Sequence, residues 1–449
     1  GGLMKKCLLI ILDGLGDRSF ASLGHQTPLQ AAHTPALDAI TRAGANGLYH
    51  AAHLGQALPS ENAHFAIFGF DPDDFPGRGA LEAIGVGIPL LEKDVALLAH
   101  LAGLYEENGF LFVRKNVAEA SPDEIAAILP AVTQPWDEDI RIEFHPVKGP
   151  FGVLKMTGDV SPYITDTNHM ADGRPVMSVV PWKPYARDAS TCNTARALSK
   201  YLSDIYRRLN AHPLNQARRR LGLTPVNGLI TQRAGRIKNI SSFSERYGLK
   251  GLSVSAGVLF KGMSAYLGLD FIRGEESDNP EEEIARRLAQ ARDALEKYDF
   301  IHVHTKAPDE AAHRKDPFLK KSVIEALDRG IARQIGPFLD DPDTLVIVTS
   351  DHSTPSEGSL VHSGEPVPLV MHGCGVRRDR VEYFDEVSAH AGALSMVRGK
   401  EMMYLILNYL DRAKLMGTMD TENDQPFWPG NYSWFALNEE GPGAGGKDE

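Results

Sequence analysis

The chain has 449 residues, of which 43% are hydrophobic and 24% charged, a composition typical of a soluble globular protein. Its formal net charge of -12 at pH 7 argues against a basic surface for nucleic acid or anionic membranes. The three cysteines, Cys7, Cys192 and Cys374, are far apart and form no CxxC pair. Neither a disulfide framework nor a thiolate zinc site is therefore expected.

No apolar run approaches the ~18 to 20 residues of a membrane span, and the run from Leu8 to Leu12 is too short for a signal peptide. We therefore expect a cytoplasmic protein without a membrane or nucleic-acid partner. Gly1 to Leu3, ahead of Met4, look like a cloning remnant, and the final "GPGAGGKDE" is typical of a disordered tail. The sequence leaves open whether the protein is a homo-oligomer.

Three segments share one form: "CLLIILDG" (7–14), "DFIHVHTKAPDEAAH" (299–313) and "DTLVIVTSDH" (343–352). Each contains a short apolar run that is followed at once by ionisable residues. This pattern predicts a strand that is buried on both faces and ends at the edge of a sheet. Because the carboxyl ends of parallel strands meet at the same edge, these ionisable side chains should gather there.

Helix-like segments lie between these strands, at 34–44, 280–298 and 319–339. Pro280 followed by three glutamates suits a helix N-terminus. Strands and helices that alternate in this way predict an α/β fold with a doubly wound, mostly parallel sheet.

The middle of the chain has a different pattern. Short alternating runs, "GFLFVRKN", "DIRIEFHPV" and "FGVLKMTG", accompany the helix-like "SPDEIAAILPAV" and predict an α+β insertion. We place an inserted cap domain at 94–204 and the core at 1–93 and 205–449. Two later segments, "NGLITQRAG" and "GLSVSAGVLFKG", are expected to give further core strands.

Six ionisable residues fall at the predicted carboxyl edge of the sheet: Asp13, Asp309, His313, Asp351, His352 and His362. Individually they have ordinary explanations, since a pair four residues apart is often a surface ion pair and a loop histidine is often just that. Together they form a mixed carboxylate and imidazole set, which suits manganese or zinc. Six ligands exceed the needs of one tetrahedral site, so the sequence predicts two divalent metal ions.

A candidate nucleophile is Ser60, which follows Pro59 and precedes a helix-like run in "ALPSENAHFAIFGFDP". The free N–H groups and dipole at a helix N-terminus favour phosphate and a serine oxyanion. The alternative is that Ser60 is merely the N-cap of the helix. Two metals beside a serine favour phosphoryl transfer, because the metals can polarise phosphoryl oxygens and align the attacking and leaving oxygens.

Several motifs together resemble those of the cofactor-independent, archaeal-type phosphoglycerate mutases of the alkaline phosphatase superfamily. The resemblance is dense over 4–95 and 295–375. The motifs are "LLIILDGLGDR", "TPLQAAHTPALDAI", "PSENAHFAIFGFDP", "GRGALEAIGVGIPL", "HTKAPDEAAH", "SDHSTP" and "VHSGEPVPLV".

This resemblance implies a glycolytic isomerase that interconverts 2- and 3-phosphoglycerate through a phosphoserine at Ser60. It further implies two divalent metal ions, Mn²⁺ or Zn²⁺. One metal would be held by Asp309, His313 and His362, and the other by Asp13, Asp351, His352 and the oxygen of Ser60. Lys261, in "LFKGMSAYLG", matches a family lysine expected near the phosphoryl group.

The chain departs from the family in the predicted cap. Where the family has an arginine-rich motif, this chain has "LLAHLAGLYEENGFLFVRKNVAEA", which keeps only Arg114 and Lys115. Likewise "ITDTNHMADG" stands where the family has Ser-Asp-Thr-Asp-Pro-His. Arginines bind carboxylate and phosphate bidentately, which lysine imitates poorly. The remaining candidates for binding the substrate anion are Arg78, Arg114, Arg233 and Arg236, each of which could instead be structural.

Two further hypotheses follow from this departure. The first is a related metal-dependent phosphatase or phosphotransferase that acts on a different small phosphorylated metabolite. The second is a non-catalytic binding protein that kept the fold, although a complete ligand set with a serine argues against it.

Overall fold

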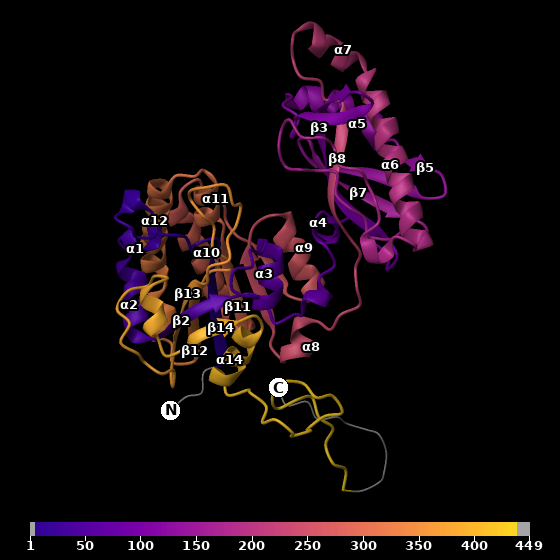
Figure 1. Cartoon of the computed structure of the whole chain (residues 1–449). Helices are drawn as coiled ribbons and strands as arrows, with labels where there is room; N and C mark the ends of the chain where they lie inside the picture. The colour runs from indigo at the N-terminus through magenta and orange to yellow at the C-terminus, as the bar shows by residue number, and fades with distance from the viewer. Residues whose placement is uncertain (1–4, 438–449) are drawn as a thin grey trace. The chain divides into compact units, whose positions relative to one another are not determined.

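The computed structural model describes residues 5–437 and divides into two compact units (Figure 1). The first unit comprises the described residues of Gly1–Pro72, Ile240–Gly257 and Leu267–Glu449. The second comprises Asp73–Asn239 and Val258–Tyr266. The predictions for Gly1 to Leu3 and for the final "GPGAGGKDE" lie outside the described residues.

An eight-stranded sheet forms the centre of the first unit, in the order β10-β9-β11-β1-β12-β13-β2-β14. Only β13 runs antiparallel to its neighbours. This arrangement confirms the predicted mostly parallel α/β fold, and the three predicted strands are central neighbours. The strands are β1 (Lys6–Leu12), β2 (Ala45–His50), β9 (Gly251–Ser255), β10 (Asp270–Arg273), β11 (Phe300–Thr305), β12 (Thr344–Thr349), β13 (Val367–His372) and β14 (Ser395–Arg398).

Helices cover both faces of this sheet (Figure 1). On one face α2, α10 and α12 pack against β1, β11 and β12 in one apolar core. On the other face Phe68 and Phe243 contact Phe300 of β11, with ring centroids 6.1 and 5.0 Å apart. The helices of this unit are α1 (Pro28–Ala31), α2 (Pro35–Ala43), α3 (Ser60–Ile67), α8 (Phe243–Tyr247), α10 (Pro280–Ala294), α11 (Ala307–His313), α12 (Pro317–Gln334), α13 (Gly336–Asp340) and α14 (Glu401–Tyr409).

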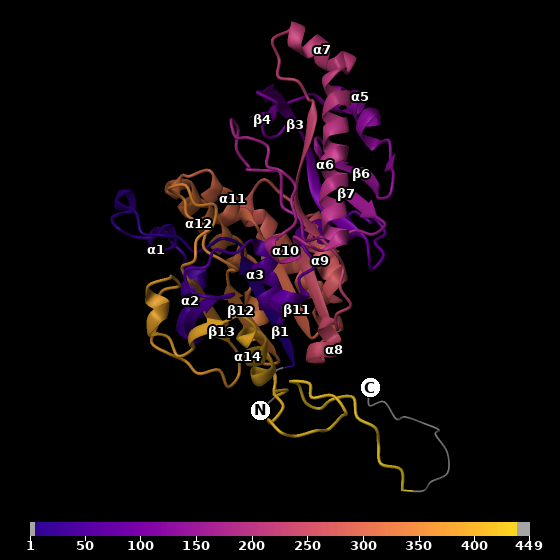
Figure 2. The ribbon, with the colours of Figure 1, turned by 45° about the vertical axis from the view of Figure 1, so that its right-hand side comes forward.

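The second unit holds a six-stranded sheet in the order β4-β3-β7-β6-β5, with β8 also paired to β3. Helices α5 and α6 pack against each other, and α5 packs on β6 (Figure 2). The elements are α4 (Arg78–Gly85), β3 (Val95–Glu107), β4 (Phe110–Lys115), α5 (Pro122–Thr133), β5 (Trp136–Asp137), β6 (Arg141–Lys148), β7 (Phe151–Thr157), α6 (Ala189–Asn210), α7 (Pro213–Arg220), β8 (Gly228–Gly235) and α9 (Val258–Leu267).

The second unit is larger than the cap predicted at 94–204. The segment "NGLITQRAG", expected as a core strand, is instead β8, because the long strand β3 pairs with β7 along one edge and with β8 along the other. Helix α4 packs on β3 and β8, and Leu209 of α6 is fully buried in the second unit's core. Residues 73–93 and 205–239 therefore belong to the second unit.

Within residues 5–437, no helix is both long and apolar enough to cross a membrane.

Candidate metal centre

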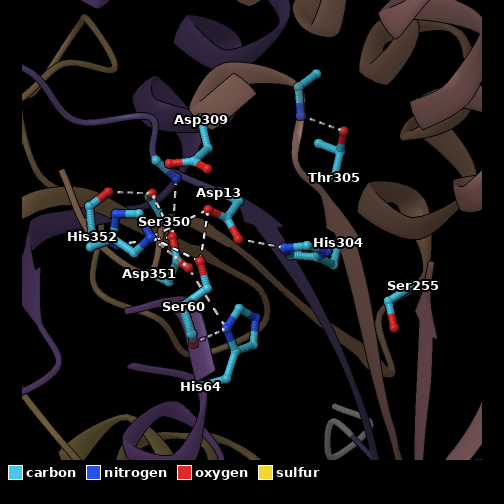
Figure 3. Close-up of polar contacts among 12 residues, drawn as sticks. Asp13, Ser60, His64, Ser255, His304, Thr305, Asp309, Ser350, Asp351 and His352 are labelled. Carbon is cyan, nitrogen blue, oxygen red and sulfur yellow. Dashed lines mark hydrogen bonds and ion pairs between the residues drawn. The ribbon is translucent and has the colours of Figure 1, made fainter. Parts of the chain in front are cut away.

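The carboxyl ends of three adjacent strands, β11, β1 and β12, bring the predicted ligands together (Figure 3). Asp13 directly follows β1, Asp351 comes two residues after β12, and Asp309 lies in α11 just after β11. Gly14 makes this close approach possible. Its φ is +66°, and a Cβ there would lie 2.5 Å from Thr354 Oγ1 and 2.8 Å from Asp309 Oδ1, so a larger residue would separate the loops.

The first group consists of Asp13, Asp351 and His352, whose ligand atoms all lie within 4.8 Å of one another. His352 Nε2 is 3.3 Å from Asp13 Oδ1 and 3.2 Å from Asp351 Oδ2. Ser60 Oγ donates a hydrogen bond to Asp13 Oδ1 at 3.2 Å and lies 3.0 Å from His352 Nε2. Ser60 is the first residue of α3, Pro59 occupies the N-cap, and no side chain caps the helix. The interpretation of Ser60 as a mere N-cap is therefore wrong.

The second group consists of Asp309, His352 and His362, again within 4.8 Å. His362 Nε2 lies 3.3 Å from Asp309 Oδ1, and the rings of His352 and His362 stack with centroids 3.8 Å apart. The predicted partner His313 is 3.1 Å from Asp309 Oδ2 and its side chain is 38% exposed. The structure thus brings all six predicted residues together, and His352 belongs to both groups.

Backbone carbonyls orient the imidazoles of His362 and His352. His362 Nδ1 lies 2.8 Å from the carbonyl of Leu58, and His352 Nδ1 lies 3.2 Å from that of Ser353. When each Nδ1 donates to its carbonyl, Nε2 keeps its lone pair and faces the carboxylates. Metal-binding histidines usually have such an outer hydrogen bond.

Three further histidines contact the centre, and the sequence patterns did not predict them as site residues. His304 Nε2 lies 2.7 Å from Asp13 Oδ2 and can donate to it. His64 Nδ1 lies 2.8 Å from the carbonyl of Ser60, and its Nε2 is 3.2 Å from His302 Nε2. The signal was present, because His302 and His304 alternate along "FIHVHT" and so share one face of β11, and His64 is one helical turn after Ser60.

Burial and crowding make this centre electrostatically unfavourable without a cation. Burial would raise the pKa of Asp13, but hydrogen bonds with His304 and His352 outweigh it and hold that pKa well below its usual value. Burial and the charge of Asp13 together raise the pKa of Asp351 well above its usual value. His352 resists its own burial through Asp351 and Asp13, which raise its pKa to about 9.

These residues fit divalent metal ions. Oδ2 of the buried Asp351 accepts no hydrogen bond from the described residues, although an oxygen in such a place normally has a partner. Hard and borderline dications prefer carboxylate and imidazole ligands. A bound dication would offset the repulsion between Asp13 and Asp351, so the donor set and its charge both suit metal.

The predicted anion-binding residues all lie in the second unit and make local contacts there. Arg78 lies 3.5 Å from Glu82 in α4, the guanidinium of Arg114 stands 4.6 Å from the Tyr105 ring centroid, and Arg236 donates to the carbonyls of Val160 and Lys93. The remaining two are Arg233, whose backbone N–H donates to Asp166, and Lys261, which is exposed on α9.

Comparison with known proteins gives a consistent result. The family model described as the Metalloenzyme superfamily matches residues 5–409. A 2,3-bisphosphoglycerate-independent phosphoglycerate mutase of Methanocaldococcus jannaschii is 38% identical over 420 residues, which is 92% of this chain and 95% of that protein. Its counterpart in Methanopyrus kandleri is 34% identical over 426 residues, or 93% and 99% of the two chains.

Solved structures agree with these sequence matches. A protein of Pyrococcus horikoshii has a TM-score of 0.76 at 30% identity and covers 93% of this chain and 100% of its own. A cofactor-independent phosphoglycerate mutase of Thermoplasma acidophilum has a TM-score of 0.62 at 29% identity, with 91% and 100% covered. The chain therefore belongs to the metalloenzyme superfamily and, within it, to the family of 2,3-bisphosphoglycerate-independent phosphoglycerate mutases.

Proposed function

We propose that this protein is a metal-dependent phosphoglycerate mutase that interconverts 2- and 3-phosphoglycerate through a phosphoserine at Ser60. The observation that carries the proposal is the position of Ser60 Oγ, 3.2 Å from Asp13 Oδ1 and 3.0 Å from His352 Nε2, at the first residue of a helix. A serine in this place lies beside the potential metal ligands, and the N-terminus of a helix favours a phosphate group. We also propose a cytoplasmic role in glycolysis, which the family membership supports.

The ligand sets we propose are Asp309, His313 and His362 for one ion, and Asp13, Asp351, His352 and Ser60 for the other. His352 lies close enough to Asp309 to contribute to both. Two bound Mn²⁺ or Zn²⁺ ions would act as Lewis acids toward phosphoryl oxygens and favour the ionised serine.

The chain's own groups carry the transfer. Ser60 Oγ loses its proton, attacks the phosphorus of the substrate in line, and the sugar-acid oxygen leaves and takes up a proton. Asp13 Oδ1 already accepts the Ser60 hydroxyl hydrogen and so orients the nucleophile. In the second half-reaction the other hydroxyl of the retained glycerate loses its proton and attacks the phosphorus of phosphoserine, the P–O bond to Ser60 breaks, and Ser60 Oγ takes up a proton.

We propose that the second unit is the substrate domain. By the family resemblance, Lys261 would offset charge on the transferred phosphoryl group. Arg78, Arg114, Arg233 and Arg236 would bind the anionic groups of the substrate. By holding the dephosphorylated intermediate and excluding water, this domain would favour the mutase outcome over hydrolysis.

One observation favours a second candidate function. Of the two basic residues left in the altered cap motif, Lys115 is paired with Glu119 at 2.8 Å and Arg114 stands over Tyr105. A cap motif whose two remaining cations are both engaged in local contacts also suits a related phosphatase or phosphotransferase that acts on a less acidic phosphorylated metabolite.

The manganese-loaded protein should be incubated with 3-phosphoglycerate and with a panel of phosphorylated metabolites, and both isomerisation and phosphate release should be followed. We expect 2-phosphoglycerate to form, and Ser60→Ala to lower this rate on the order of 10⁴-fold or more. The variant should form no phosphoenzyme while its metal content stays largely unchanged. Release of phosphate without isomerisation would favour the second candidate, and a Ser60→Ala variant that still forms phosphoenzyme would refute the nucleophile.

A further inference from the structure

A buried lysine lies beneath the metal centre and has no part in the proposed chemistry. Lys320, on α12, is 0% exposed. Its ammonium donates to three oxygens: the carbonyl of Gly16 at 3.0 Å, the carbonyl of Thr354 at 2.9 Å and Asp17 Oδ2 at 3.2 Å. All three N–H groups of the ammonium are therefore used.

These three oxygens belong to the two loops that carry the predicted ligands. Gly16 and Asp17 follow Asp13 after β1, and Thr354 follows His352 after β12. The loops are joined directly as well, because the Thr354 N–H donates to the Gly16 carbonyl at 2.9 Å. Lys320 thus ties both loops to α12.

Thr354 connects this ammonium to the predicted metal ligands, and most directly to Asp309. Its carbonyl accepts from Lys320, and its Oγ1 donates to Asp309 Oδ1 at 2.7 Å. The chain of contacts from Lys320 through Thr354 ends on a carboxylate of the Asp309, His352 and His362 group. The same Oγ1 lies 3.2 Å from Nδ1 of His352, which belongs to both groups, so Thr354 reaches the Asp13 and Asp351 group through this imidazole.

Stability alone does not explain the buried ammonium group of Lys320. Burial lowers the pKa of Lys320, while Asp17 opposes this shift. Buried ion pairs contribute little net stability compared with apolar residues of similar volume, because desolvation offsets their attraction. A fully satisfied buried charge does, however, hold its partners in one arrangement.

We propose that Lys320 is a positioning residue for the metal centre, which acts through Thr354 to fix Asp309 for the ion held with His352 and His362. This inference rests on the proposed role of that group as a metal site. The hydrogen bonds of Lys320 within the described residues go to Gly16, Asp17 and Thr354, none of which is a predicted ligand.

The test is Mn²⁺ titration of metal-free Lys320→Met by calorimetry. Two ions should still bind, one of them up to about 10-fold more weakly, because Lys320 acts one contact beyond the outer partners whose loss costs about 10- to 100-fold. The affinity for the second ion, which Thr354 reaches only through His352, should fall less. Because Lys320→Met leaves Asp17 buried without its cation, the double variant Asp17→Asn/Lys320→Met removes both charges and serves if the single variant does not fold.

A matched control is Asp328→Asn on the same helix. Asp328 is also buried and ties another segment to α12, since it accepts from the backbone N–H groups of Ala36 and Leu37 at 3.1 and 2.8 Å. This variant should lower the stability of the protein without changing either Mn²⁺ affinity. Equal losses of affinity in both variants would show a general structural effect and overturn the inference.

Thr354→Val tests the route. It removes the hydroxyl that donates to Asp309, so Lys320→Met should add little to its effect if the two residues act in series. Unchanged affinity in Lys320→Met, or fully additive losses, would overturn the inference, as would wild-type protein that binds fewer than two ions. Two ions bound normally by a protein without mutase activity would refute the proposed function alone.

Discussion

The two units use buried charge differently. In the first unit Asp13, Lys320 and Asp351 are 0%, 0% and 2% exposed at one edge of the sheet. In the second unit the core is apolar, and a buried cation such as Arg218 makes local contacts with Glu124 and with backbone carbonyls. The comparison teaches that the chemistry is fixed by a network in which each charge depends on its neighbours. The hydrogen bonds of Arg218 within the described residues, by contrast, go to one carboxylate and to backbone carbonyls of its own unit.

Asp351→Asn should have the largest effect, because it changes the charge network of the first unit directly. This variant should bind Mn²⁺ at least about 100-fold more weakly than wild type. The loss of a direct ligand should reduce metal affinity at least as much as the loss of one of its outer hydrogen-bond partners. In the metal-free protein the same substitution should be favourable and increase the free energy of unfolding. The raised pKa of Asp351 means that its charge costs stability at any pH above its unfolded value. In chelator at pH 7, Asp351→Asn should therefore be about 1 to 3 kcal/mol more stable than wild type.

Denaturant unfolding at several pH values checks both signs. The advantage of the metal-free variant should shrink as the pH falls through about 4 and vanish well below it, where Asp351 is protonated in the unfolded state as well as in the folded state. If the variant is less stable than wild type in chelator, then the Asp351 carboxylate does not destabilise the metal-free protein. The inferred repulsion between Asp13 and Asp351 would then be wrong.

Glu386→Gln should have the next largest effect. This residue supports the Asp13 loop, because it accepts from the Asp17 N–H and the Thr27 hydroxyl, and burial raises its pKa to about 7. The folded state then binds more protons than the unfolded state between pH ~4.5 and 7, so stability falls as pH rises through this window. Glutamine should remove this fall, which amounts to on the order of 3 kcal/mol.

The measurement is the free energy of unfolding of both proteins from pH 5 to pH 8. The two curves should lie closest together at pH 5, separate up to about pH 7 and run parallel above it, with the variant more stable. Parallel curves over the whole range would show that burial does not raise the pKa of Glu386. The ionised side chain would then cost less folding stability than we infer.

The smallest effect is expected in the second unit. Arg114→Gln should raise KM for the phosphorylated substrate up to about tenfold, the loss of about 1.4 kcal/mol of binding, and leave metal content unchanged. Arg141→Gln is the matched control, because Arg141 is occupied by Asp137 and Glu143 at 2.8 and 2.7 Å and should leave KM unaltered. A loss of bound metal in Arg114→Gln would contradict the division of roles between the units.

Much of the candidate metal centre could be predicted from the sequence. Three branched apolar runs that end in acids predicted three buried parallel strands, and the structure places them side by side as β11, β1 and β12. Proximity of the six predicted residues followed from this alone, because parallel strands share an edge. Pattern could not place His352 between both groups, since that depends on how the loop folds back over Asp309.

The extent of the second unit was not readable in the same way. Strand β8 has the composition of a core strand, and only the free edge of β3 decides which sheet it joins. Local sequence records how a segment is buried but not which partner buries it.

The sequence by itself determined the fold class, the edge of the sheet where the ionisable groups gather, and the serine that starts α3. These features follow from local periodicity and from the rule that parallel strands end together. Only the tertiary structure decided that His304 and His64 support Asp13 and Ser60, and that Lys320 joins the ligand loops from 304 residues beyond Gly16. Such contacts depend on packing between distant segments, which no local pattern encodes.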